Sequence, residues 1–445
     1  MKQVTPPTAE ELALAQDILA RAGQLDPNSR AYIELENAAA RLRKTAKKRR
    51  KAARASESRR ADASRLAGRG IVAEREGTPG NEETRLEGSN PGPPQLNRRR
   101  QCYVCLEPFR DLHAYYHRLC PSCGDASLDA RKVRADLRGR RALVTGGRIK
   151  IGFAIALRLL RDGAEVHVTS RFPNDAMRRY RDEPDAADWM HRLTVHGCDF
   201  RDLRALFTMV RSFAAGDPFD ILINNAAQTV WRPPAYYREL HAGEDAKTGL
   251  TQAVDERTEA LLSSVDTLFP VGTRNAFGDP LDLRRENSWV MSLGDVPVGE
   301  FLESQVVNSI APYLICSELL ESMRSAAVSE RFVINVSAAE GQFSRKDKLA
   351  RHPHTNMAKA SLNMLTATSA SELATDGIYM VSVDPGWVSH EGPVGTSGEV
   401  IGARPLGTPL CAEDAAARLY HPIASGIFGR PRYGVLLKDF EEVAW

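Results

Sequence analysis

Residues 141–171, RALVTGGRIKIGFAIALRLLRDGAEVHVTSR, restrict the possible folds of this chain more than any other stretch. A strand-like segment at 142–145 leads into a turn with glycines, and a second strand-like segment follows at 164–169. Between them, apolar residues recur at helical spacing, at Ile151, Ile155, Leu159 and Leu160. This pattern predicts two parallel strands joined by a helix, because parallel strands require such a crossover. The helix N-terminus would present free N–H groups to a pyrophosphate.

Six motifs follow one another along the second part of the chain. They are Thr145–Gly152 with the sequence TGGRIKIG, Asn224–Ala227 with NNAA, Asn308, Ser337 at the end of FVINVS, Lys359 shortly before SLNML, and Asp384–Val388 with DPGWV. Their order resembles that of the short-chain dehydrogenase/reductase family over about residues 139–440. The resemblance implies an α/β fold at residues 139–445, with the doubly wound parallel sheet of a Rossmann domain.

The resemblance also implies an activity and a set of site residues. Ser337 would polarise a carbonyl or alcohol oxygen, Lys359 would bind the nicotinamide ribose, and Asn308 would hold a water in a proton relay. Asp199, after the third strand, would contact the adenine amino group. A small carbonyl or alcohol substrate and a homo-oligomer are implied as well. The other implied nucleotide-binding residues are Gly146, Ile151, Gly152, Asn225, Pro385 and Gly386.

Three positions depart from the family pattern. Lys150 replaces the middle glycine of the turn, where a side chain would crowd the nucleotide although its ammonium could pair with a phosphate. Ala227 replaces the last glycine of NNAG. Thr355 stands four residues before Lys359, where the family has its tyrosine. An aliphatic hydroxyl is far too weak an acid to replace a phenol, whose pKa is about 10.

The chemistry at Thr355 decides between two functions. The favoured prediction is an NADP(H)-dependent oxidoreductase with atypical proton delivery, in which Thr355 holds a water or a substrate oxygen. His352 and His354 lie beside it and titrate near neutrality, so one of them could supply the acid, although loop histidines are more often surface residues. The alternative is a catalytically impaired pseudoenzyme that binds NADP(H) as a structural or sensing ligand and works through protein or nucleic-acid contacts.

Charge at the end of the second strand indicates the form of the cofactor. The strand ends in Thr169-Ser170-Arg171 and not in an acidic residue that would bind a ribose 2′-hydroxyl, and Arg148 lies in the turn. Two guanidinium groups near a 2′-phosphate favour NADP(H) over NAD(H). The alternative role for Arg171 is that of a solvated loop cation.

The connection between Asn225 and Asn308 holds 82 residues, which is long for this family. We interpret residues 229–300 as an insertion that serves as a lid or a partner-binding subdomain, since substrates enter at the carboxyl edge of such a sheet. The glycine-rich residues 390–411 correspond by resemblance to the mobile substrate loop.

The cysteines predict a metal site. Four of the seven lie within 22 residues, as two CxxC pairs formed by Cys102, Cys105, Cys120 and Cys123. Two such knuckles let four thiolates converge on one tetrahedral ion, so we expect a closed structural Zn²⁺ site in a module at residues 99–127. Metal binding would supply much of the folding free energy of so small a module. We interpret His113 and His117 as surface or packing residues.

The first hundred residues are basic, with 21 Lys+Arg against 13 Asp+Glu. Residues 1–67 predict helices: Thr8 and Glu11 form a capping box, and Asp26-Pro27 starts a long polar helix. Residues 41–69 carry 13 basic residues, which fits a nucleic-acid-binding arm, but a solvated helical face is favoured because no aromatic side chains accompany the charges. Residues 68–98, rich in Gly, Pro and charge, predict a flexible linker.

No run of the roughly 20 apolar residues that span a membrane is present. The start of the chain also lacks the apolar core of a secretory signal. We therefore expect a cytoplasmic protein with no membrane partner.

Overall fold

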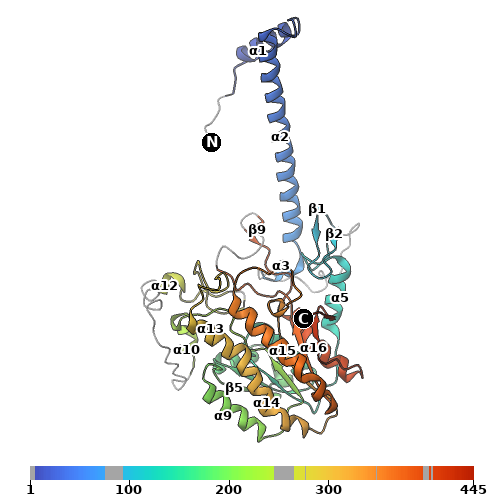
Figure 1. Cartoon of the computed structure of the whole chain (residues 1–445), viewed down its shortest axis with the longest axis vertical. Helices are drawn as coiled ribbons and strands as arrows, with labels where there is room; N and C mark the ends of the chain where they lie inside the picture. The colour runs from blue at the N-terminus through green and yellow to red at the C-terminus, as the bar shows by residue number, and fades with distance from the viewer. Residues whose placement is uncertain are drawn as a thin grey trace. The chain divides into compact units, whose positions relative to one another are not determined.

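The computed structural model describes residues 6–75, 94–244, 265–275, 277–346, 348–393, 400–401 and 404–445 (Figure 1). The chain divides into two compact units. One consists of Met1–Leu66 with Leu96–Arg98, and the other of Ala67–Gln95 with Arg99–Trp445. Among the described helices, none has both the length and the apolarity that crossing a membrane requires.

The first unit contains two helices. Helix α1 (Ala9–Ala22) begins with the predicted capping box, in which the Glu11 N–H donates to Thr8 Oγ1 at 3.2 Å and the Thr8 N–H donates to Glu11 Oε2 at 2.7 Å. Helix α2 (Arg30–Ala67) starts later than the predicted Asp26-Pro27, because the Ser29 hydroxyl accepts the Tyr32 N–H and caps the helix there.

The second unit is built on an eight-stranded sheet. Its strand order is β12-β11-β8-β7-β6-β3-β4-β5, and all neighbours are parallel except β12 with β11. The chain order reverses between β3 and β6, which places a crevice beyond their carboxyl ends. The strands are β3 (Arg141–Val144), β4 (Glu165–Ser170), β5 (Leu193–Gly197), β6 (Ile221–Asn224), β7 (Arg331–Val336), β8 (Ile378–Asp384), β11 (Leu436–Lys438) and β12 (Glu441–Val443).

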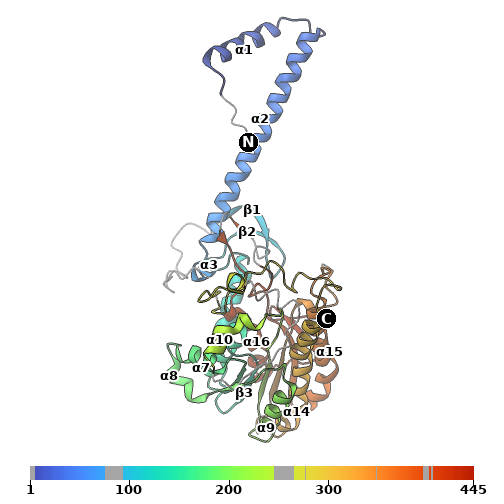
Figure 2. The ribbon, with the colours of Figure 1, turned by 90° about the vertical axis from the view of Figure 1, so that its left-hand side faces the viewer.

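Helices cover both faces of this sheet, which lies between two layers (Figure 2). Successive side chains of β3 point to opposite faces of the sheet. Ala142 and Val144 pack in the hydrophobic cluster that contains α6 and α16 residues, whereas Leu143 packs in the cluster on the other face. One layer holds α6 (Lys150–Arg161) and α16 (Ala412–Ile427); the other holds α9 (Leu203–Ala214), α14 (Ala311–Arg324) and α15 (Pro353–Thr375). The predicted doubly wound α/β fold is thus confirmed.

Short elements connect these layers, and several belong to the predicted insertion. They are α7 (Pro173–Arg181), α8 (Ala186–Trp189), η1 (Met190–Arg192), η2 (Pro234–Tyr237), α10 (Arg238–Ala242), α12 (Val265–Leu268), α13 (Val298–Gln305), η3 (Val306–Ile310), η4 (Ala339–Gly341), and the hairpin of β9 (Val400–Ile401) and β10 (Arg404–Pro405). Residues 245–264 of the insertion, and 394–399 and 402–403 of the predicted substrate loop, lie outside the described residues.

The cysteine-containing segment also belongs to the second unit, except for Leu96–Arg98. It comprises α3 (Gly70–Arg75), β1 (Gln95–Gln101), β2 (Pro108–Asp111) and α5 (Pro121–Lys132). The structure therefore differs from the predicted linker at both of its ends. Ile71 and Val72 of α3 are buried, and the Ile71 N–H donates to the Tyr115 carbonyl at 3.0 Å. Residues 76–93 of that linker lie outside the described residues.

Candidate functional site

The turn after β3 depends on its glycines. Gly146 has a φ of 70°, and a Cβ there would lie 2.9 Å from the Cα atom of Ala226. At Gly152, in the first turn of α6, a Cβ would lie 2.2 Å from the carbonyl oxygen of Gly146. The turn therefore folds tightly back over the N-terminus of α6, whose free N–H groups can bind an anion.

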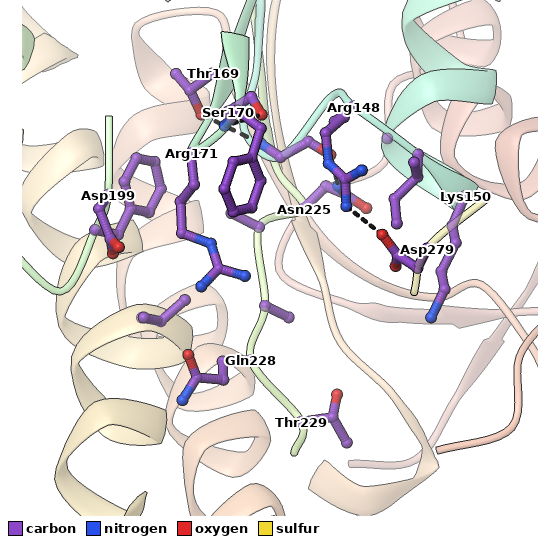
Figure 3. A pocket seen from close by; sticks show the side chains of 18 of the residues that line it. Arg148, Lys150, Thr169, Ser170, Arg171, Asp199, Asn225, Gln228, Thr229 and Asp279 are labelled. Carbon is purple, nitrogen blue, oxygen red and sulfur yellow. Dashed lines mark hydrogen bonds and ion pairs between the residues drawn. The ribbon is translucent and has the colours of Figure 1, made fainter. Parts of the chain in front are cut away.

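A cavity of about 300 Å³ lies beside this turn, at the carboxyl ends of the strands around the switch point (Figure 3). This is the size range of ligand pockets. Of the predicted nucleotide-binding residues, those that line it are Gly146, Arg148, Ile151, Gly152, Arg171, Asp199 and Asn225. The lining does not include the predicted Lys359, Pro385 and Gly386.

Lys150, which was expected to crowd the nucleotide, lines the cavity, and its ammonium is paired with a carboxylate of the cavity wall. Its φ is 54°, and its Nζ lies 2.9 Å from Glu391 Oε1 and 5.2 Å from the centroid of the Phe277 ring. Glu391 also lies 3.6 Å from Arg232. Burial alone would raise the pKa of Glu391, but the charges of Lys150 and Arg232 lower it to about 2. The cavity wall therefore contains an ionised carboxylate between two cations.

Arg148 was predicted to bind the 2′-phosphate of the nucleotide, but its guanidinium is paired with two carboxylates. Its guanidinium donates to Asp175 at 2.9 Å and to Asp279, which belongs to the insertion (Figure 3). Two carboxylates neutralise this cation, so it is not free to bind a 2′-phosphate. The contact instead fastens the insertion to the glycine turn.

Arg171, the other predicted cation, differs from Arg148 in its partners. Its side chain extends into the cavity (Figure 3), where its guanidinium lies 4.6 Å from the centroid of the Tyr237 ring and donates to the Tyr237 hydroxyl at 3.1 Å. No carboxylate of the described residues lies within ion-pair distance of it. Asp199, on the same wall, accepts hydrogen bonds from Arg201 at both oxygens, and this contact lowers the pKa of Asp199 although burial opposes it.

The predicted catalytic residues do not converge on the cavity. The Ser337 hydroxyl is buried and donates to Asn363 Oδ1 at 2.6 Å. Lys359 Nζ donates to the Val336 carbonyl at 2.7 Å, and burial lowers its pKa to about 8. The side chains of Ser337 and Lys359 thus form hydrogen bonds between β7, its C-terminal end and α15.

Asn308 lies in η3, a π-helical turn, and acts as a positioning residue. Its side-chain amide donates to the Gln228 carbonyl at 2.8 Å and accepts the Gln228 N–H at 2.6 Å. These two bonds hold the segment after β6, which lines the cavity. Such π-turns often occur at functional sites.

Thr355 and His354 are buried side by side at the start of α15. Among the described residues, the Thr355 hydroxyl has no hydrogen-bond partner, and the His354 ring has only a weak contact with the Thr229 backbone. Buried polar groups are seldom left in this state, so these atoms are candidates for a ligand or water contact. His352, by contrast, stacks on Trp289 with ring centroids 4.2 Å apart.

Sequence reasoning missed several residues of the cavity wall. Tyr237, Arg232 and Asp279 come from the insertion, and Glu391 follows the PG segment. The only available signal was the aromatic and cationic run WRPPAYY at 231–237, which pointed to a lid.

The four cysteines of the two CxxC pairs come together as predicted. Their sulfur atoms lie within 4.8 Å of one another, and Cys105 Sγ and Cys120 Sγ are 3.8 Å apart. A tetrahedron with Zn–S bonds of about 2.3 Å has edges of about 3.8 Å. The donor set therefore fits a metal ion. His113 and His117 are both buried packing residues outside this group.

The cysteine-containing segment docks on the Rossmann domain through a buried polar contact. Arg131 of α5 donates to Asp414 of α16 at 2.8 Å, and the Tyr116 hydroxyl donates to the same carboxylate. Asp414 is completely buried, so these partners are needed to offset its desolvation.

Comparisons with known proteins agree with this architecture. Residues 140–242 match the family model for short chain dehydrogenases. The chain is 32% identical over 345 residues to uncharacterized protein R665 of Acanthamoeba polyphaga mimivirus, covering 73% of this chain and 71% of that protein. It is 26% identical over 266 residues to D-erythrulose reductase of Gallus gallus, covering 55% of this chain and 97% of the reductase. The solved structure of NADPH-bound carbonyl reductase from chicken fatty liver is 18% identical, with a TM-score of 0.46, covering 71% of this chain and 98% of that one.

The parallel sheet with helices on both faces and the crevice at the switch point define a Rossmann-type α/β fold. The chain belongs to the short-chain dehydrogenase/reductase family of oxidoreductases.

Proposed function

We propose that the cavity binds NADP(H) and that Arg171 recognises the 2′-phosphate. The observation that supports this is the guanidinium of Arg171, which projects into the cavity at the end of β4, donates to the Tyr237 hydroxyl and has no carboxylate partner among the described residues. A stacked guanidinium without a carboxylate partner is well suited to bind a phosphate through two N–H groups. The predicted second cation, Arg148, is not needed for this role.

Calorimetric titration of Arg171→Gln with NADP⁺ and NAD⁺ tests this proposal. Charge-assisted hydrogen bonds contribute roughly 1.5–3 kcal/mol, so the variant should bind NADP⁺ about 10- to 100-fold more weakly while its affinity for NAD⁺ stays the same. Arg138→Gln removes an exposed arginine far from the cavity lining and serves as the matched control. Equal losses for both nucleotides would contradict the 2′-phosphate role.

The chain's own residues would hold the rest of the nucleotide. The first turn of α6 offers N–H groups to the pyrophosphate, and the Asn225 amide fixes the turn by donating to the Thr145 carbonyl at 2.9 Å. Asp199 would accept from the adenine amino group. When bound, NADP(H) supplies the hydride of the reaction, and the protein supplies binding and orientation.

The proposed reaction is hydride exchange with a small carbonyl or alcohol, without a phenolic proton donor. We assign the proton transfer to His354, with Thr355 holding a water or a substrate oxygen beside it. Burial lowers the pKa of His354, although the nearby charge of Glu300 opposes this. The imidazole is therefore neutral at pH 7 and able to accept a proton from an alcohol.

The first experiment is to denature the purified protein, identify any released nucleotide, and assay hydride exchange on a carbonyl and alcohol panel. His354→Gln should abolish turnover without affecting NADP⁺ binding, whereas His352→Gln should retain turnover. If both variants keep full turnover, the role of His354 is wrong.

The second candidate is a pseudoenzyme that uses NADP(H) as a structural or sensing ligand. The contact between Ser337 and Asn363 favours it, because it occupies the hydroxyl that would polarise the substrate. Tight NADP⁺ binding without any turnover on the panel would support this candidate over the oxidoreductase.

For the four cysteines we propose a structural Zn²⁺ site. Four thiolates leave no coordination position open for chemistry. Metal analysis of the purified protein should find one zinc per chain, and chelation should unfold the module while the sheet survives. A native protein without metal would contradict this assignment.

A further inference from the structure

Helix α2 carries a dense positive face that the oxidoreductase function does not use. Between Arg41 and Arg60 it has eleven Lys and Arg residues and a single acidic one, Glu57. The side chains of all eleven are exposed. The ion pairs of α2 join Arg30 to Glu34 and Arg65 to Asp62, so they lie outside this segment.

Helical geometry gathers most of these charges on one side. At 100° per residue, seven of the eleven fall within about half of the helix circumference, over about 16 Å of its length. We call this set the cationic face; it consists of Arg43, Lys44, Lys47, Lys48, Arg50, Lys51 and Arg54. Mutual repulsion of unpaired like charges destabilises a helix, so the arrangement is best explained by an anionic partner.

We propose that the cationic face binds the phosphate backbone of double-stranded nucleic acid. A duplex carries one charge per about 1.7 Å of axis, so a 16 Å length presents about ten phosphates to the seven cations. The major groove of a DNA duplex also admits an α-helix. This inference is independent of the proposed cofactor and reaction.

Other polyanions fit α2 less well. Insertion into a membrane surface requires a large apolar face opposite the charges, but residues 41–60 contain only Leu42 and alanines as apolar side chains. Single-stranded nucleic acid is commonly held by stacking on aromatic rings, and this segment has no aromatic residue. The remaining contact is to backbone phosphates, which predicts binding without sequence preference.

The test is fluorescence anisotropy of a labelled 20-base-pair DNA duplex with the full-length protein at several salt concentrations. Seven phosphate contacts predict a slope of about −6 in a plot of log K against log[salt], and a roughly 10³- to 10⁴-fold loss of affinity between 50 and 200 mM salt. The triple variant Lys47→Ala, Lys51→Ala, Arg54→Ala should reduce the slope by about three.

A control variant removes charge from the opposite side of α2, with Arg49→Ala and Arg60→Ala. It should leave most of the slope in place, and circular dichroism should show unchanged helix content in both variants. An equal reduction of the slope per removed charge in the two variants would show that the cationic face is not the binding surface. No retention of the duplex, or binding only to phosphatidylserine vesicles or to a single-stranded oligonucleotide, would overturn the proposal.

Discussion

The hydroxyl of Tyr103 accepts a hydrogen bond from the backbone N–H of Trp387 at 2.8 Å. Tyr103 lies between the cysteines of the first CxxC pair, and Trp387 belongs to the PG segment after β8. Four residues beyond Trp387 is Glu391, which pairs with Lys150 in the glycine turn. The cysteine-containing segment thus supports the chain that forms one wall of the cavity.

Loss of metal should therefore weaken dinucleotide binding, although none of the four cysteines of the CxxC pairs lines the cavity. Removing one neutral hydrogen bond costs about 1 kcal/mol, so Tyr103→Phe should weaken NADP⁺ binding by about fivefold, and chelation should have a larger effect. Calorimetry on the native and chelated protein measures both. Tyr433→Phe alters a half-exposed tyrosine and is the control. Unchanged affinity after complete zinc removal would refute the coupling.

The turn should not tolerate a methyl group at Gly152. Gly152→Ala places a Cβ against the Gly146 carbonyl and the Asn225 amide, so the turn must open. We expect loss of measurable NADP⁺ binding and a lower melting temperature. Gly299→Ala, in α13, meets no atom within 4 Å and should keep binding intact. Binding by Gly152→Ala at wild-type affinity would show that the turn does not contact the nucleotide.

The ion pairs of Glu391 predict a pH-dependent stability. Because its folded-state pKa of about 2 lies below the ordinary value, the contribution is complete above about pH 4.5 and disappears as the pH falls toward 2. It amounts to roughly 3 kcal/mol at pH 7. Urea unfolding should show Glu391→Gln less stable than wild type at pH 7, with a gap about 1 kcal/mol smaller at pH 3.5. If the difference in the free energy of unfolding between wild type and Glu391→Gln is the same at both pH values, Glu391 is not paired in solution.

We expect the Thr355 hydroxyl to lower the free energy of unfolding although it contributes to turnover. Thr355→Val removes a buried hydroxyl that has no partner among the described residues, so the free energy of unfolding should rise by about 1 kcal/mol. Turnover, if present, should fall about tenfold. Thr366→Val is the contrasting variant, because the Thr366 hydroxyl is bonded to Asn335 and Ser382, and its loss should destabilise the fold. If Thr355→Val is less stable than the wild type, the Thr355 hydroxyl has a hydrogen-bond partner in the folded protein and the prediction is wrong.

Local patterns predicted much of this protein. The strand, turn and helix at residues 141–161 and the convergence of four cysteines were predicted correctly, because they depend on neighbours within a short stretch of chain. The helix start at Asp26-Pro27 was wrong, because the competing cap at Ser29 could not be ranked against it from the sequence.

The partners of the charged side chains could not be predicted. Arg148 and Asp279 are 131 positions apart, and Lys150 and Glu391 are 241 apart. Sequence patterns indicated correctly that these cations lie at the glycine turn, but not that carboxylates from distant segments neutralise them.

The sequence by itself determined the parallel sheet, its glycine-containing turn and the four-sulfur cluster, because periodicity, backbone conformation and ligand spacing are local properties. Only the tertiary structure decided which cations of the cavity are paired with carboxylates of the described residues and which hydroxyl groups face the core. Charge pairing and burial depend on segments that chain folding brings together from far apart.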